Sequence, residues 1–165
     1  MISVLIATQN DEEGLAGTLA ALVSAAVEGV VREVIVCDAG SDDGTELVAD
    51  HAGCVFLANA RWVDGVQLAR SAWLLFLEPG ARLLPDWIEP VVTHVVSRGG
   101  AATFTRAEEA RLTFLQRLRA RRPLEEGLLM PKADFVSSNC DAEAFRGKGG
   151  LRRLGARIVP SSPQN

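Results

Sequence analysis

Long apolar runs and paired cysteines are what this sequence most clearly lacks. No apolar run approaches the roughly 18 residues that a membrane-spanning helix requires. Met1–Val4 has no basic group ahead of its apolar stretch, so we expect a strand here and not a signal peptide. The three cysteines are an odd number at scattered positions, which favours reduced thiols in the cytoplasm. His51 and Cys54 lie close in sequence, but two potential ligands do not make a metal site.

The sequence also has no internal repeat, no low-complexity segment and, near its first strand, no glycine-rich loop followed by Arg or Lys. The last absence disfavours a nucleotidyltransferase. Hydrophobic residues make up 48% and charged residues 23% of the 165 residues, which is typical of a folded globular chain. We therefore expect a single domain over residues 1–160 and a frayed tail over residues 161–165.

The net charge of −4 conceals an asymmetry between the two parts of the chain. Residues 1–60 contain ten acids and one arginine, giving −9, whereas residues 61–165 contain eleven acids and sixteen bases, giving +5. Such a division favours a cation- or sugar-facing site in the first part and a phosphate- or lipid-facing surface in the second. Solvated helix faces of uneven sign explain the asymmetry equally well.

Short apolar runs alternate with helical patterns up to about residue 100. The expected strands are Ile2–Ala7, Glu33–Cys37, Cys54–Leu57, Trp73–Leu77, Ala101–Thr105 and Leu128–Met130. Helices are expected from Asn10 to Gly29, about Asp42–His51, within 59–70, over 107–122 and over 141–154, and another with Pro85 in its first turn. This alternation predicts an α/β fold with a doubly wound, mostly parallel sheet and helices on both faces.

Several details of these helices follow from single residues. Asn10 is expected to cap the first helix with Glu13 three residues later, and Gly29 to end it. Its apolar stripe is Leu15, Leu19, Leu22, Val23 and Ala26, and Leu47 and Val48 should face inward on the second helix. Pro90 predicts a kink or a late start in the helix that contains Pro85.

The segment Val34–Thr45 dominates the interpretation. An apolar run ends at Asp38, turns through Gly40 and leads into a helix that begins at Ser41 or Asp42. Ligands of α/β proteins bind beyond the carboxyl ends of parallel strands, so we expect Asp38 to point into a binding crevice. Its carboxylate only accepts hydrogen bonds and would select a ligand that presents a donor on the facing edge. The alternative is that Asp38 and Asp42 merely satisfy the amides of the turn and the helix start.

Taken together, Thr8–Glu13 and Asp38–Thr45 resemble the nucleotide-binding motifs of family 2 glycosyltransferases, which have the Rossmann-like GT-A fold. The resemblance covers residues 1–100 closely and the remainder loosely. It implies a nucleotide-binding half over 1–100 and a shortened acceptor-side half over 101–160. The residues it assigns to the nucleotide are Thr8, Asn10, Glu12, Asp38, Gly40 and Arg70.

Two arginines are candidates for the diphosphate of the donor. The family's Ala-Arg stretches resemble Ala60-Arg61 and Ala69-Arg70, and the helix between them looks about three residues shorter than is usual. The shortening disturbs the register of Arg61, so Arg70 is the preferred contact, with a fork of N–H groups suited to phosphate oxygens. The alternative for Arg70 is a surface arginine favoured by the helix dipole.

The metal motif of the family is degenerate here. After the strand resembling Trp73–Leu77, the family places Asp-x-Asp, whose last carboxylate binds Mg²⁺ or Mn²⁺. This chain has Glu78-Pro79-Gly80, so the resemblance assigns the metal to Glu78 and leaves glycine at the second acidic position. One carboxylate holds a hard divalent ion only weakly. Arg82 would repel a cation or stand in for its charge.

The family's catalytic base is an acidic pair shortly before an Arg-Arg-Leu helix, and the corresponding region is compressed here. The resemblance leaves Asp141 or Glu143 as the base that deprotonates an acceptor hydroxyl. Residues 106–122 contain six arginines, so a helix there could lie on an anionic membrane that presents a lipid-linked acceptor. A solvated face is the alternative for Arg106–Arg122. Few aromatic residues accompany these arginines, which disfavours nucleic acid as a partner.

Two hypotheses follow. The first is an inverting transferase that moves sugar from a nucleoside-diphosphate sugar, with UDP favoured, to an acceptor hydroxyl, for example on a lipid-linked acceptor or an envelope polysaccharide. It would act in the cytoplasm, with peripheral membrane contact as an option. The second is a catalytically inactive relative that binds a nucleotide or a partner. A response of nucleotide affinity to Mn²⁺ distinguishes them.

Overall fold

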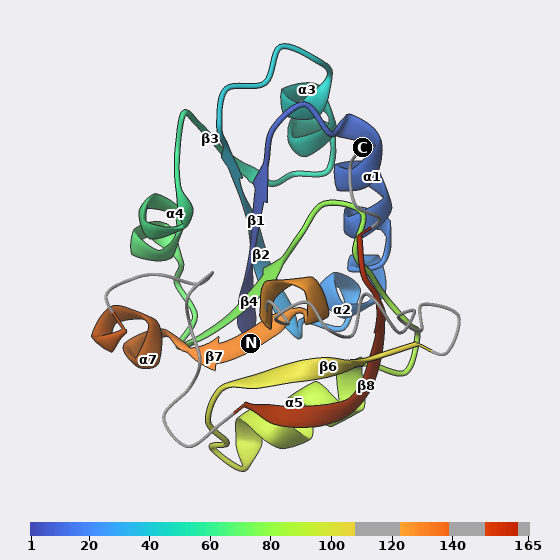
Figure 1. Cartoon of the computed structure of the whole chain (residues 1–165), viewed down its shortest axis with the longest axis vertical. Coiled ribbons are helices and arrows are strands. Elements are labelled where there is room, and N and C mark those ends of the chain that lie inside the picture. Colours follow the sequence, from blue (N-terminus) through green and yellow to red (C-terminus); the bar gives the residue numbers. More distant parts are fainter. Residues whose placement is uncertain (108–122, 139–150, 162–165) are drawn as a thin grey trace, which may run out of the picture.

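The computed structural model describes residues 1–107, 123–138 and 151–161 of the protein (Figure 1). These residues form an eight-stranded sheet in the order β3-β2-β1-β4-β7-β6-β8-β5. The strands are β1 (Ile2–Thr8), β2 (Val31–Asp38), β3 (Val55–Ala58), β4 (Trp73–Leu77), β5 (Arg82–Leu83), β6 (Ala102–Arg106), β7 (Leu128–Pro131) and β8 (Arg152–Val159). The helices are α1 (Glu12–Ala20), α2 (Val23–Val27), α3 (Thr45–His51), α4 (Trp62–Leu68), α5 (Ile88–Val96), the 3₁₀ helix η2 (Pro123–Glu126) and α7 (Lys132–Ser137).

The sheet has a parallel half and a mixed half. Strands β3, β2, β1 and β4 are parallel neighbours, built from the continuous apolar runs that suit strands covered on both faces. Beyond them β7 pairs antiparallel with β4 and β6, β8 runs parallel to β6, and β5 pairs antiparallel with β8. The predicted α/β fold with a mostly parallel sheet is therefore confirmed, with some antiparallel strands at one side.

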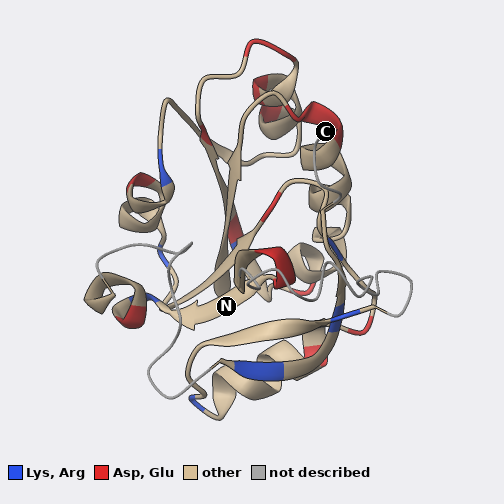
Figure 2. Ribbon diagram, viewed as in Figure 1, with Lys and Arg blue, Asp and Glu red and all other residues tan. Residues whose placement is uncertain are grey.

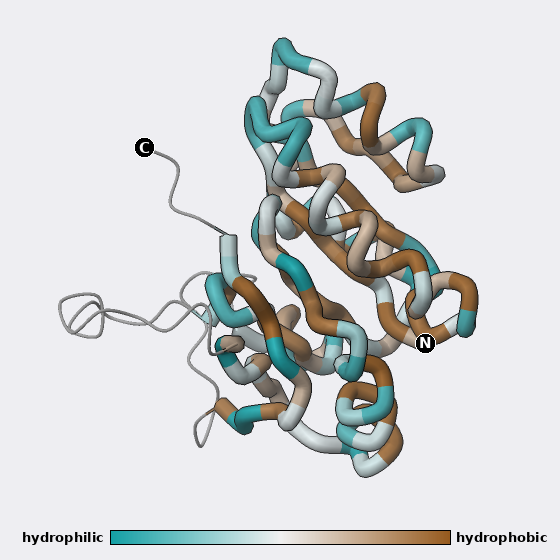
Figure 3. Tube along the Cα trace, turned by 90° about the vertical axis from the view of Figure 1, so that its right-hand side faces the viewer, coloured by the Kyte–Doolittle hydropathy of each residue, from teal (hydrophilic) through white to brown (hydrophobic). Residues whose placement is uncertain are grey.

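Helices cover both faces of the sheet, as predicted (Figure 1). On one face, residues of α1, α2, α3 and α5 pack against β1 and β4, among them Leu15, Ala49 and Val91. On the other face, α4, η2 and α7 pack around Phe76, whose ring stacks on Phe135 with centroids 5.2 Å apart. Figure 3 shows the hydrophobic segments running through the strands between these helices.

The first helix differs from the expectation. Asp11, not Asn10, caps α1, because its carboxylate accepts from the Gly14 amide at 3.0 Å. The helix then tightens into bonds to the third preceding carbonyl at Ala21 and Leu22, which rotates α2 relative to α1. As a result Ala25 faces the core, and the predicted core residues Val23 and Ala26 are exposed.

The second helix begins three residues later than the predicted start at Asp42. Asp43 fastens the turn before it by accepting from the Thr45 hydroxyl and from the Thr45 amide at 3.0 Å. The Thr45 hydroxyl, helped by the Thr45 and Glu12 amides, holds the pKa of Asp43 below its usual range. With this start the helix buries Thr45 and Ala49, so the prediction that Leu47 faces inward is wrong.

Helix α5 begins late, as predicted, whereas strand β8 replaces the end of a predicted helix. Helix α5 starts late, which puts Pro90 in its first turn, where an N–H has no partner within the helix. Residues 152–154, predicted as the end of a helix, begin strand β8 instead. The rest of that helix and residues 108–122 lie outside the described residues.

Cys37 and Cys54 are free thiols, and burial raises the pKa of each to about 11, so both are protonated at neutral pH.

Among the helices that the structure describes, none combines the length and the apolar character that crossing a bilayer requires.

Candidate functional site

Thr8 and Asp38 lie side by side where the parallel strands β1 and β2 end. The carboxyl ends of β3 and β4 reach the same end of the sheet, which we call the carboxyl end. Asp38 is only 2% exposed. Its Oδ2 accepts from the amides of Gly40 at 2.9 Å and Ser41 at 2.8 Å, and its Oδ1 accepts from the Ser41 hydroxyl. Asp38 therefore holds the turn that follows β2.

Reciprocal hydrogen bonds join this turn to the loop after β1. The backbone amide of Asn10 donates to the Ser41 hydroxyl at 2.8 Å, and the Asn10 side-chain oxygen accepts from the Asp42 backbone amide at 2.9 Å. Glu12 accepts from the Gly44 amide at 2.8 Å. The resemblance assigned Asn10 and Glu12 to the nucleotide, and the structure uses both side chains to lock the two loops together.

Glycine is required at position 40 for two reasons. Its φ of 101° lies in the region that disfavours other residues, and an added Cβ would approach the Asn59 side-chain oxygen to 3.2 Å. Gly40 thus lets the loops after β2 and β3 meet. The Thr8 hydroxyl beside them is buried, and none of the residues that the structure describes forms a hydrogen bond with it. A buried unpaired hydroxyl is uncommon in folded proteins, and it marks this end of the sheet as a place where a ligand could complete the bonding.

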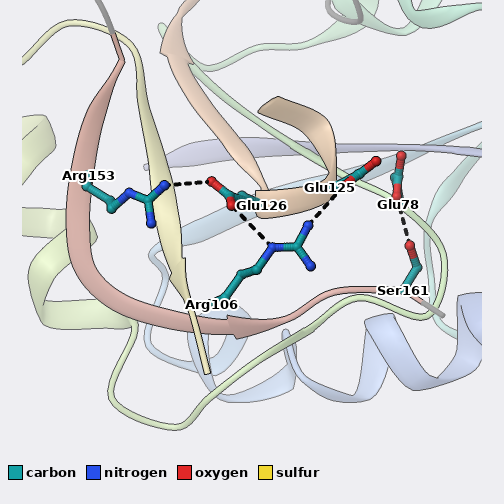
Figure 4. A network of polar contacts seen from close by, with 6 residues as sticks. All are labelled: Glu78, Arg106, Glu125, Glu126, Arg153 and Ser161. Atoms are coloured by element: carbon teal, nitrogen blue, oxygen red, sulfur yellow. Dashed lines mark hydrogen bonds and ion pairs between the residues drawn. The ribbon is translucent and has the colours of Figure 1, made fainter. Parts of the chain in front are cut away.

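Glu78 follows β4 at the same end of the sheet. Its Oε2 accepts from the Ser161 hydroxyl at 2.8 Å, so the segment after β8 reaches this carboxylate (Figure 4). The turn beyond it is tied to α1 by the Gly80 amide, which donates to the Gly14 carbonyl at 2.9 Å. Gly80 has a φ of 83°, so this turn favours glycine where the family carries a second acid.

The donor set for a divalent ion is small. Glu78 and Ser161 together offer a carboxylate and a hydroxyl, both oxygen donors of the kind that Mg²⁺ and Mn²⁺ accept. In the described part of the chain, no group of three or more His, Cys, Asp or Glu side chains could hold a metal. Glu78 fits an ion that takes most of its ligands from phosphate oxygens and water.

The two arginine candidates lie at opposite ends of the sheet. Helix α4 runs back from the end of β3 to the start of β4, so Arg61 is exposed at the carboxyl end and Arg70 is at the other end. Arg70 pairs with Glu33 near the start of β2, at 3.7 Å. Five residues of β1, roughly 17 Å, separate this end from Thr8. The structure therefore does not bring Arg70 to Asp38, and Arg61 takes its place as the candidate.

The predicted bases Asp141 and Glu143 lie outside the described residues. The structure instead points to Glu125 and Glu126, which were not among the site residues predicted from the sequence. Arg106, for which the sequence left a membrane-facing and a solvated position open, is turned to these two carboxylates at 2.9 and 3.2 Å. A sequence signal did exist, because only Gly127 separates the two acids from the strand Leu128–Pro131 that pairs with β4.

The surroundings of the carboxyl end are acidic. Figure 2 shows red segments on α1, on α3 and on the loops beside them, whereas blue segments lie along β8. The acids near this end include Asp11, Glu12, Asp42, Asp43 and Glu78. Such a field opposes a bare diphosphate and favours a divalent cation beside it.

The comparisons with known proteins agree with this architecture. The model of the family described as Glycosyl transferase family 2 matches residues 3–147. No curated protein sequence matches the chain.

Solved structures supply the fold comparison. Mannosyl-3-phosphoglycerate synthase from Rubrobacter xylanophilus is 13% identical with a TM-score of 0.71, over 99% of this chain and 68% of that one. Glucosyl-3-phosphoglycerate synthase from Mycobacterium tuberculosis, in complex with Mn²⁺, UDP and glucosyl-3-phosphoglycerate, is 17% identical with a TM-score of 0.64, over 100% and 72%. The same enzyme with Mn²⁺, UDP and phosphoglyceric acid is 20% identical with a TM-score of 0.62, over 83% and 57%. The fold is thus that of GT-A glycosyltransferases, and this chain spans only part of each of them.

Proposed function

Because this chain belongs to glycosyl transferase family 2, we propose that it transfers a sugar, with inversion, from a nucleoside-diphosphate sugar to an acceptor hydroxyl. The observation that carries the proposal is the pairing of Thr8 with Asp38 at the carboxyl end of the sheet, inside loops locked by Asn10 and Glu12. Nucleotides bind at this position of open α/β sheets. UDP is the favoured nucleotide, since the similar glucosyl-3-phosphoglycerate synthase was solved with UDP.

Asp38 can recognise the base while it holds the turn. A carboxylate has about four acceptor positions, and the described contacts use two on Oδ2 and one on Oδ1. The remaining position on Oδ1 would accept the ring N–H of uracil. The near-complete burial of Asp38 implies that Ser41 turns aside when the base enters. The unpaired Thr8 hydroxyl supports a contact to the nucleotide from the neighbouring strand.

We assign the diphosphate to the region between Arg61 and Glu78, at the ends of β3 and β4. A divalent ion bound there, by Glu78 and the Ser161 hydroxyl, would neutralise charge on the leaving diphosphate. Two observations support this role: the acidic surroundings of the site, and the Mn²⁺ in the similar glucosyl-3-phosphoglycerate synthase structures.

The two arginines provide a matched test of this placement. We expect Arg61→Ala to weaken UDP binding by roughly tenfold, because a phosphate contact by a charged donor contributes about 1.5–3 kcal/mol and this arginine is exposed. Arg70→Ala should leave the UDP affinity unchanged. Calorimetric titration of both variants checks this, and a loss confined to Arg70→Ala would reverse the assignment.

The metal role of Glu78 has a separate test. In the wild-type protein, Mn²⁺ should strengthen UDP binding, and Glu78→Gln should remove most of that gain while leaving metal-free binding near the wild-type value. Glu89→Gln, at an exposed position on α5, is the control. The same Mn²⁺-dependent gain in Glu78→Gln as in the wild-type protein would show that the ion sits elsewhere.

For the transfer itself, the acceptor oxygen attacks the anomeric carbon opposite the leaving diphosphate. The family resemblance offers Asp141 or Glu143 as the base, and both stay predictions because they lie outside the described residues. Acceptors to screen are phosphorylated acids, since phosphoglyceric acid is present in a similar structure, and lipid-linked or polysaccharide hydroxyls at the inner face of the membrane. Membrane contact would have to come from residues 108–122, because Arg106 is held by glutamates.

One observation favours a second function. Gly80 occupies the second acidic position of the metal motif, in a backbone conformation that disfavours aspartate, so a catalytically inactive nucleotide-binding relative is the alternative. Release of UDP from a UDP-sugar separates the two functions. An active transferase releases UDP in the presence of Mn²⁺ and an acceptor, whereas a binding module holds the nucleotide and releases none.

A further inference from the structure

Glu126 forms a buried ion-pair network beside the carboxyl end of the sheet. Its side chain is 5% exposed and accepts from Arg106 Nε and from an Arg153 terminal nitrogen, both at 3.2 Å (Figure 4). Arg106 belongs to β6 and is itself 15% exposed. Removing such groups from water has a large desolvation penalty, so a buried pair adds little to stability by itself. What it provides here is a fixed position for the Arg106 guanidinium.

That guanidinium holds a second carboxylate. Arg106 donates its terminal nitrogen to Glu125 Oε2 at 2.9 Å, and Glu125 is 40% exposed. The other residues of η2 are buried, so Glu125 is the member of this helix that faces outward. Its second oxygen, Oε1, has no partner among the described residues. The network thus anchors one oxygen of Glu125, and no described residue occupies the other.

The short helix η2, which carries Glu125, lies beside strand β4, which Glu78 follows. Strand β7 pairs antiparallel with β4 through Phe76 and Leu128, and η2, which precedes β7, contacts β4. A close approach between Gly127 and the Leu77 side chain, 3.2 Å from an added Cβ, keeps the two chains together there. In Figure 4 the Glu125 and Glu78 side chains extend the same way from these neighbouring segments.

We propose that Glu125 is the general base of the transfer and that Glu126 and Arg106 are its positioning residues; this rests on the proposed function. Glu125 Oε1 takes the proton of the acceptor O–H as the acceptor oxygen forms its bond to the anomeric carbon. The bond from that carbon to the diphosphate oxygen breaks, and the nucleoside diphosphate leaves with the electron pair. Solvent then removes the proton from Glu125. Water in place of the acceptor gives the free sugar by the same steps.

The test compares Glu125→Gln with the wild-type protein in two measurements, UDP affinity by calorimetry and UDP release from a panel of UDP- and GDP-sugars with Mn²⁺. Glutamine keeps the size of the side chain but cannot take the proton. We expect the UDP affinity to stay within about twofold and the rate of UDP release to fall by roughly 10²–10⁴-fold, the usual contribution of a general base. The rate of UDP release by the wild-type protein should fall at low pH. The residual rate of Glu125→Gln should not show this fall.

The controls separate this proposal from its competitors. Asp86→Asn removes another arginine-paired carboxylate, which contacts Arg157 at 3.3 Å, and should leave both measurements unchanged. Asp141→Asn and Glu143→Gln address the bases that the family resemblance favours. A normal rate in Glu125→Gln, or a loss of rate confined to Asp141→Asn or Glu143→Gln, overturns the proposal and leaves the transferase function intact. UDP binding by the wild-type protein without any UDP release also overturns it, and absence of UDP binding overturns the proposed function itself.

Discussion

Asp38→Ala is expected to remove UDP binding and to destabilise the protein by about 2–4 kcal/mol. The amides of Gly40 and Ser41 lose the charged acceptor that they share, and a hydrogen bond to a charged group contributes about 1.5–3 kcal/mol. The Ser41 hydroxyl, which links this turn to Asn10, loses its partner as well. Equilibrium urea unfolding measures the loss of stability, and calorimetry with UDP measures the loss of affinity.

Asp38→Asn separates recognition of the base from support of the turn. Its carboxamide oxygen can still accept from the two amides, but its NH₂ group would meet the ring N–H of uracil as donor against donor. We expect a smaller loss of stability than in Asp38→Ala and a roughly 10–100-fold weaker UDP affinity. Asp42→Ala, on the same turn with an exposed side chain, is the matched control. Unchanged UDP affinity in a folded Asp38→Asn variant would restrict Asp38 to holding the turn.

Glu126→Ala is expected to lower the free energy of unfolding by about 3–5 kcal/mol. Of the two described partners of the largely buried Arg106 guanidinium, this variant keeps only the partly exposed Glu125. Removing one member of a buried ion pair is strongly destabilising, because the other charge stays buried without compensation. Arg153 is about half exposed and can turn toward water, so most of the effect should come from Arg106. Urea unfolding of the two proteins measures the difference.

A double-variant cycle tests the cause of that effect. Replacing both partners, as in Arg106→Leu with Glu126→Leu, should recover much of the stability, because neither charge is then left buried. Asp86→Ala, which breaks an exposed pair with Arg157, should cost no more than about 1 kcal/mol. A loss in Glu126→Ala as small as that in Asp86→Ala would mean that the network contributes no more than a surface ion pair.

The strands of the parallel half were predictable because burial on both faces leaves continuous apolar runs in the sequence. Trp73–Leu77 was predicted with both bounds correct, and Asp38 at the end of its strand followed from the same reasoning. The late start of the next helix was also predictable from Pro90, but Pro85 precedes the helix, which begins at Ile88, and does not lie in its first turn.

Features that depend on tertiary contacts were not predictable from local patterns. Asn10 has the chemistry of a helix cap, but a hydrogen bond from Asp42, distant in sequence, draws it into another role. Arg61 and Arg70 lie at opposite ends of the helix between them and therefore at opposite ends of the sheet. Spacing in the sequence does not show which of the two lies at the carboxyl end. Strand β8 alternates buried and exposed residues from Leu154 onward, a period-2 pattern hidden beneath the resemblance to an Arg-Arg-Leu helix.

The Glu125–Arg106 pair shows the same limit from another side. The two residues are nineteen positions apart in the sequence, and most of the residues between them lie outside the described ones. Only the pairing of β6 and β4 with β7 brings β6 and η2 to the same place. Two adjacent acids before a strand are a weak signal in the sequence, and the buried arginine gives them their significance.

The measurement that tests the central claim most directly is calorimetric titration of the wild-type protein with UDP and GDP, each with and without Mn²⁺. We predict binding of UDP in the micromolar range that strengthens when Mn²⁺ is present, as expected for a nucleotide held beside Asp38 with its diphosphate near Glu78. A well-folded sample that binds neither nucleotide under either condition would contradict the account, and the carboxyl end of the sheet would then serve no nucleotide.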